Sequence, residues 1–145
     1  MSRAFVKEHD GPEPLLERPV SDAPNYVTPR GQHLLREALA RAERDGDERA
    51  TRYYAERLAS AIVVEPPSHT RGVVEFGATV VVRDAKGAQL TVRIVGEDEA
   101  DPAQGTISWE SPIAKALTDH RVGDRVTVTR PAGPIAYTIE EIRSA

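Results

Sequence analysis

Two patterns of hydrophobic and polar positions divide the chain. Between about residues 28 and 63, apolar residues such as Leu35, Leu39 and Ala42 recur three or four positions apart, with polar residues between them. This spacing gives a helix one apolar face. From Gly72 onward, β-branched residues alternate with polar ones, which is typical of strands in a half-buried sheet. The pattern therefore predicts a helical part followed by a sheet part.

Capping signals divide the helical part into two helices. Thr28 followed by Pro29 is typical of an N-cap with proline at the first helical position. Gly46 is the expected turn residue, and Asp47 is a candidate cap for a second helix that runs to about Val63. A connection this short predicts a short antiparallel helical hairpin in which the two apolar faces meet.

The sheet part shows strands separated by turn residues. Lys86 and Gly87 mark the tip of a hairpin, and Ser111 followed by Pro112 predicts the start of one short helix. The expected strands lie in the segments ATVVVRDAKGAQLTVRIVG, TISWE and DRVTVTRPAGPIAYTIEEI. These elements predict an α+β fold in which a twisted antiparallel sheet carries the short helix on one face.

The expected domain organisation has three parts. Residues 1–24 hold four prolines and many charges, which predicts a flexible or extended tail. Residues 25–67 form the expected helical hairpin, and residues 68–145 form the expected C-terminal domain.

Composition narrows the classes of function. The chain has no cysteine, and no apolar run approaches the roughly 20 residues that span a bilayer. The N-terminus has no signal-peptide pattern, so we expect a cytoplasmic protein without a membrane partner. A net charge of -4 argues against coating nucleic acid by bulk electrostatics. The four histidines lie far apart in the sequence, so no metal site is predicted.

An acidic cluster is the main candidate for a site. Glu97, Asp98, Glu99 and Asp101 fall within five positions. A solvated loop between strands, a metal site, acid/base chemistry and a docking loop for a basic partner are the alternatives. The spacing lacks the twelve-residue calcium-loop pattern, which disfavours a metal, and composition alone favours a solvated loop.

Several blocks of the C-terminal part resemble one known family. FGATVVV, IVGEDEADPAQGTISWESPIAKAL, VGDRVTV and PAGPIAYTIEEI occur in the order and spacing of the C-terminal domain of the GreA/GreB transcript cleavage factors. The resemblance implies an FKBP-like domain that binds RNA polymerase at the rim of its secondary channel, where a basic coiled coil of the β′ subunit meets the acidic loop. It makes Glu99, Asp101 and Pro102 the leading contact residues, with Asp98 and Ser111 next.

The helical part resembles a shortened Gre arm. NYVTPRG and YYAERLASAIVVEPP are similar to the start and the end of the family's coiled coil, but only RDGDERA joins them, where the family carries an acidic tip close to GDLSENAEY. Helices of about 16 residues reach roughly 24 Å, about half of what the family arm implies. This truncated coiled coil is similar to that of the nucleoside diphosphate kinase regulator. Asp45, Asp47 and Glu48 are tip candidates for a magnesium ion shared with the polymerase, or else ordinary caps and solvated residues.

The sequence thus predicts a bacterial transcription elongation regulator that occupies the channel rim, competes with full-length Gre factors, and has neither enzymatic activity nor a cofactor of its own. The first alternative is an active cleavage factor, whose acidic tip would act near the RNA 3′ end with magnesium in the polymerase active site. A prolyl isomerase is the third, least favoured reading, because two phenylalanines and one tryptophan hardly build an aromatic-lined pocket.

Overall fold

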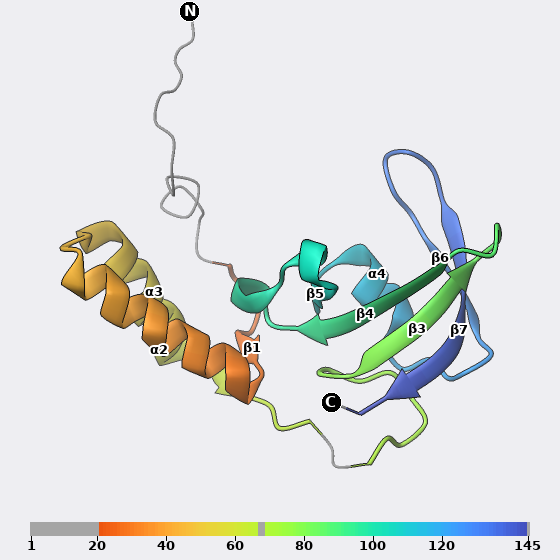
Figure 1. The fold of residues 1–145 in the computed structure, drawn as a ribbon, viewed down its shortest axis with the longest axis horizontal. Coiled ribbons are helices and arrows are strands. Elements are labelled where there is room, and N and C mark those ends of the chain that lie inside the picture. The colour runs from red at the N-terminus through yellow and green to blue at the C-terminus, as the bar shows by residue number, and fades with distance from the viewer. Residues whose placement is uncertain (1–20, 67–68, 145) are drawn as a thin grey trace, which may run out of the picture.

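The structure is a computed structural model that describes residues 21–66 and 69–144. A pair of helices forms one end of the molecule, and a sheet with a short helix forms the other (Figure 1). The elements follow in the order β1 (Tyr26–Val27), α2 (Pro29–Arg44), α3 (Glu48–Ser60), β2 (Ile62–Val63), β3 (Thr79–Asp84), β4 (Gln89–Val95), the 3-10 turns η1 (Glu97–Glu99) and η2 (Pro102–Gln104), β5 (Thr106–Ser108), α4 (Pro112–Leu117), β6 (Arg125–Val128) and β7 (Ile135–Arg143).

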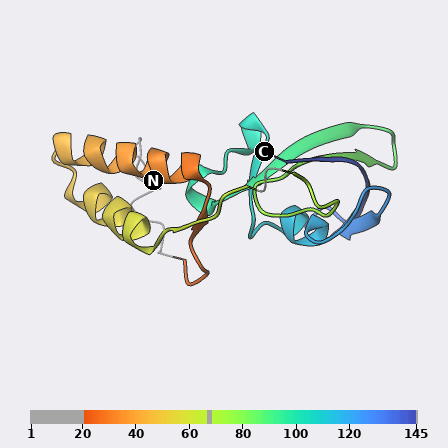
Figure 2. The same cartoon turned by 90° about the horizontal axis from the view of Figure 1, so that it is seen from below.

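Both predicted caps start the paired helices. The Thr28 hydroxyl accepts a hydrogen bond from the Gly31 amide at 2.9 Å, and Pro29 occupies the first position of α2. The Asp47 carboxylate accepts from the Ala50 amide at 3.0 Å at the start of α3. α2 and α3 pack against each other along their length (Figure 2).

The predicted end of the second helix was wrong. α3 ends at Ser60, and the next residues leave the helix to pair in parallel with β1. The Ile62 amide donates to the Asn25 carbonyl at 2.8 Å, and the Val64 amide donates to the Val27 carbonyl at 2.9 Å. Because this pairing joins segments distant in sequence, helical periodicity alone extended the helix too far.

The C-terminal sheet has the strand order β5-β4-β3-β7-β6. The pairs β3–β4, β3–β7 and β6–β7 are antiparallel as predicted, but β4 and β5 are parallel, so the expectation of a wholly antiparallel sheet was wrong. The two 3-10 turns bring the chain back beside the second half of β4, where Thr106 lies opposite Arg93 and Ser108 opposite Val95. A strand of three residues carries no pattern that reveals its direction.

The core lies between one face of the sheet and α4. Val80, Val82, Ile94 and Ile139 point to this face, and Leu117 covers it from the helix; all five are at most 1% exposed. The period-2 pattern of the strands and the apolar side of α4 thus produce the core predicted for an α+β domain.

The predicted three-part division lies partly beyond the described residues. Residues 1–20 of the expected tail and residues 67–68 at the expected domain boundary are outside them. Within the described part of the chain, no helix is long and apolar enough to cross a lipid bilayer.

Candidate functional site

The acidic cluster forms two consecutive 3-10 turns that connect β4 to β5. η1 holds Glu97, Asp98 and Glu99, and η2 begins at Pro102 with Asp101 as its cap. The Asp101 carboxylate accepts from the Ala103 amide at 3.2 Å. η1 lies at the junction between the helix pair and the sheet, whereas η2 contacts β5 (Figure 2).

Glu99 points toward the helix pair and binds the start of α2. Its carboxylate accepts from the Thr28 hydroxyl at 2.6 Å, from the Thr28 amide at 3.0 Å and from the Gly96 amide at 3.2 Å. Amides at a helix N-terminus lack intrahelical partners and carry partial positive charge, so a carboxylate is stabilised there.

Asp98 binds the other helix. The Arg57 guanidinium donates from Nε to Oδ2 of Asp98 at 2.6 Å, and the Tyr53 hydroxyl donates to Oδ1 at 2.5 Å. The Arg57 and Asp98 side chains are 2% and 8% exposed, respectively. Paired burial of this kind satisfies two charges that would be costly to bury alone.

Asn25 extends this buried network to β1. Its side-chain oxygen accepts from Nη2 of Arg57 at 2.8 Å, and its side-chain amide donates to the Arg57 carbonyl at 2.7 Å. β1, α3 and η1 are therefore tied together through one arginine.

Two glycines permit this close approach. A Cβ atom on Gly96 would lie 2.4 Å from the Tyr26 carbonyl oxygen, and one on Gly31 would lie 2.2 Å from Oε2 of Glu99. Real Cβ contacts are not that short, so a side chain at position 96 would push the turn away from β1, and one at position 31 would displace the Glu99 carboxylate from the start of α2.

Aromatic side chains cover the same junction. The Tyr26 ring packs edge-on against Trp109, with centroids 5.0 Å apart, and at 6.2 Å from Phe76. This packing places Trp109 at the contact between β1 and the sheet domain. The sequence pattern did not single out Asn25, Tyr26 or Arg57, because their contacts join segments far apart in the chain.

The predicted contact residues divide into two groups. Asp101 and Pro102 are exposed, and their role as docking residues stays a prediction. Asp98 and Glu99 need a correction, because their carboxylates are bonded to the helix pair rather than presented to a partner. The Ser111 hydroxyl caps α4 by accepting from the Ala114 amide at 3.3 Å.

The tip residues have the geometry of helix ends. Asp45 follows α2, Asp47 caps α3 through its carboxylate, and Glu48 is the first residue of α3. Among the described residues, no group of three or more histidines or acidic residues is arranged to hold a metal ion.

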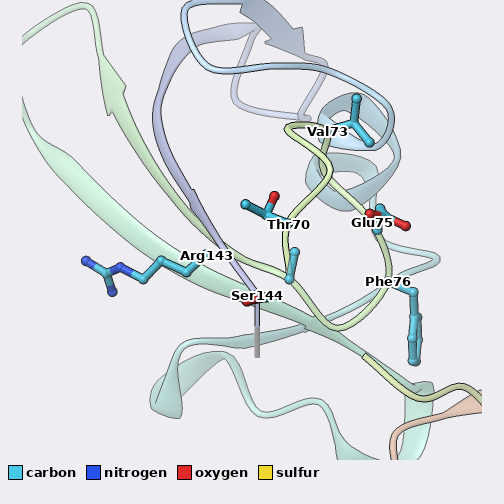
Figure 3. Close-up of a pocket in the computed structure, with 7 residues that line it drawn as sticks. Thr70, Val73, Glu75, Phe76, Arg143 and Ser144 are labelled. Carbon is cyan, nitrogen blue, oxygen red and sulfur yellow. The ribbon is translucent and has the colours of Figure 1, made fainter. Parts of the chain in front are cut away.

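A small hollow lies between the segment before β3 and the end of β7. Figure 3 shows Thr70, Val73 and Phe76 on that segment, with Arg143 at the end of β7 and Ser144 directly after it. Its volume is about 10 Å³, which holds one water molecule at most and no substrate.

Comparisons with known proteins agree with the resemblance. GreA of Alkalilimnicola ehrlichii is 47% identical over 89 residues, which are 60% of this chain and 56% of that protein. GreB of Yersinia pestis is 44% identical over 96 residues, which are 66% of this chain and 56% of that protein. The aligned part of the chain thus spans about half the length of these relatives.

The similarity to solved structures is lower than the similarity to these sequences. The crystal structure of GreA factor homolog 1 of Thermus thermophilus matches with a TM-score of 0.45 and 24% identity, over 83% of this chain and 99% of that one. The sequence model described as transcription elongation factor GreA/GreB, C-terminal part, matches residues 68–144, which is more than half of the chain. The chain therefore belongs to the GreA/GreB transcription elongation factor family.

Proposed function

We propose that this protein is a transcription elongation regulator that binds bacterial RNA polymerase at the rim of the secondary channel. The observation that carries the proposal is the family match over residues 68–144, which includes both turns of the acidic loop. In this proposal the sheet and α4 are an FKBP-like docking domain, and α2 with α3 is a truncated coiled-coil arm. The protein would act in the cytoplasm, where the polymerase is.

The exposed turn after η1 is the proposed docking surface. Asp101 and Pro102 are both exposed, and the Asp101 carboxylate holds its own turn through the Ala103 amide. A carboxylate on a proline-stiffened turn steers toward lysine or arginine and loses little entropy on binding. A basic coiled coil of the β′ subunit would be its partner.

The short arm supports a role as a competitor without chemistry of its own. α2 has 16 residues, which is roughly 24 Å of helix. Asp47 at the tip already caps α3, which occupies one of its carboxylate oxygens. A protein of this shape would occupy the rim and exclude full-length Gre factors.

A second candidate function is transcript cleavage itself. Asp45 and Glu48 are exposed at the tip, and such carboxylates could share a magnesium ion with the polymerase active site. The cofactor would then belong to the polymerase, and the protein would assist its nuclease reaction near the RNA 3′ end.

Competition for the polymerase tests the docking proposal. A labelled full-length Gre factor is bound to core polymerase, and its displacement is followed as this protein is added. We expect displacement by the wild type and at least tenfold weaker displacement by Asp101→Arg. Glu65→Arg, a charge reversal at an exposed position outside the loop, is the matched control and should behave as wild type. Equal displacement by wild type and Asp101→Arg would contradict the proposal.

A further inference from the structure

The loop between β4 and β5 has two faces with different neighbours. Asp98 and Glu99 on η1 bind the helix pair, whereas Asp101 and Pro102 at the start of η2 are exposed. Ala100 alone separates η1 from the cap of η2. The residues that hold the helices and the residues offered to a partner are therefore neighbours on one short segment.

We propose that Asp98 and Glu99 are positioning residues, which fix the direction of the helix pair relative to the docking turn. Docking of η2 would then determine where the tip of the helix pair lies on the partner. The placement of the tip on a partner rests on the proposed docking function. The fixed direction of the helix pair is a property of the free protein.

The bonds from η1 reach the helix pair at separate points. Glu99 binds Thr28 at the start of α2, and Asp98 binds Tyr53 and Arg57 on α3. A bond to one helix would leave the pair free to swivel about it. Bonds to both helices remove that freedom, and Arg57 donates a further hydrogen bond to Asn25, which directly precedes β1.

The other described contacts across the junction are the close approach of Gly96 to β1 and aromatic packing. Among the described elements, η1 makes the main contact of α2 with the C-terminal domain. Tyr26 against Phe76 and Trp109 adds apolar burial, which is not directional. Hydrogen bonds and ion pairs have preferred geometry, so the direction of the helices depends on the two carboxylates.

The length of the helices makes small rotations matter. A swivel of about 20° about the junction would move the end of a helix of roughly 24 Å by about 8 Å. That displacement is larger than the reach of a side-chain contact. A loosened junction would therefore leave docking intact and lose the placement of the tip.

Distances between two spin labels test the fixed direction in the free protein. The natural chain has no cysteine, so Arg52→Cys on α3 and Lys86→Cys at the β3–β4 turn give one label on each side of the junction. We expect one narrow distance distribution for the otherwise wild-type protein. Asp98→Ala and Glu99→Gln should each broaden it, and the double variant should broaden it most.

Glu140→Gln is the matched control. It removes a carboxylate that pairs with Arg83 on the sheet, at 2.5 Å and away from the junction, and it should leave the distribution narrow. Circular dichroism verifies that each variant keeps its helices. Glu99→Gln serves as the milder variant if Asp98→Ala fails to fold. A narrow, unchanged distribution in folded Glu99→Gln and in the folded double variant would overturn the proposal.

Polymerase binding separates this role from docking itself. The Asp98→Ala and Glu99→Gln variants should keep wild-type affinity for the polymerase, in contrast to Asp101→Arg. A photocrosslinking residue in place of Arg52 should crosslink to a single site on the polymerase in the otherwise wild-type protein. In the two variants this single crosslinking site should be lost. A loss of affinity equal to that of Asp101→Arg would overturn the positioning role. If the wild type does not bind the polymerase, the docking proposal fails, and the label distances still decide whether the direction is fixed.

Discussion

Arg57 on α3 and Asp98 on η1 form a buried ion pair with 2.6 Å between Nε and Oδ2. The two residues are 41 positions apart in the chain, so the pair exists only in the folded protein. It joins the helix pair to the loop that the family resemblance assigns to docking.

Removing Asp98 should strongly destabilise the junction. In Asp98→Ala the Arg57 guanidinium stays buried without its carboxylate, and breaking a buried pair in this way typically costs about 3–5 kcal/mol. We expect a loss of this size in the free energy of unfolding, measured with urea. Trp109 reports on the junction through its fluorescence, because its ring packs against Tyr26. A loss below about 1 kcal/mol would contradict the burial argument.

Gly96→Ala tests the close approach of the loop to β1. Gly96 has a φ of -72°, which any residue adopts, so its requirement is for space and not for backbone conformation. The added Cβ would meet the Tyr26 carbonyl oxygen at 2.4 Å, and overpacking of this kind costs about 1–3 kcal/mol. Gly46→Asn is the control, because nothing lies within 4 Å of its Cβ position and asparagine tolerates its φ of 68°. Equal stability of Gly96→Ala and wild type would show that the approach is looser than described.

Thr28→Val should weaken the start of α2. Valine has nearly the shape of threonine but lacks the hydroxyl that accepts from Gly31 and donates to Glu99. Loss of an N-cap costs about 1–2 kcal/mol. Thr28→Ser keeps the hydroxyl and should retain most of the stability. Hydrogen exchange of the amides in the first turn of α2 measures the effect, and equal protection in the Val and Ser variants would count against it.

Glu140 should titrate below its ordinary range. Hydrogen bonds from Arg83 and then Gln89 hold the pKa of this carboxyl below its usual value of 4.5, with the charge of Arg83 contributing further. Because the folded-state pKa is lowered, the stabilising effect is complete above pH 4.5 and is lost as the pH falls through the folded-state value. An NMR titration of the side-chain carboxyl carbon measures this. In Arg83→Gln the pKa should rise toward 4.5, and an unchanged midpoint would mean that the pair does not form in solution.

Local patterns predicted the elements better than the contacts between them. Thr28, Asp47 and Ser111 were recognised as caps because a cap depends on residues three positions away. The parallel pairing of β1 with β2 and of β4 with β5 was missed, since it depends on segments brought together by the fold. For the same reason, Asp98 and Glu99 looked like members of an exposed acidic loop. Gly31, in the first turn of α2, was a local signal of the Glu99 contact. A glycine is unfavourable in a helix unless another group approaches its backbone closely, as the Glu99 carboxylate does here.

The most direct test of the proposed function uses a backtracked elongation complex, with the RNA 3′ end followed on a gel. We predict that this protein causes no cleavage and inhibits cleavage by a full-length Gre factor, and that Asp101→Arg relieves the inhibition. Cleavage by the wild type that disappears in the Asp45→Asn, Asp47→Asn and Glu48→Gln triple variant would contradict this account. Asparagine at position 47 can still cap α3, so such a loss would show that the acidic tip takes part in the reaction.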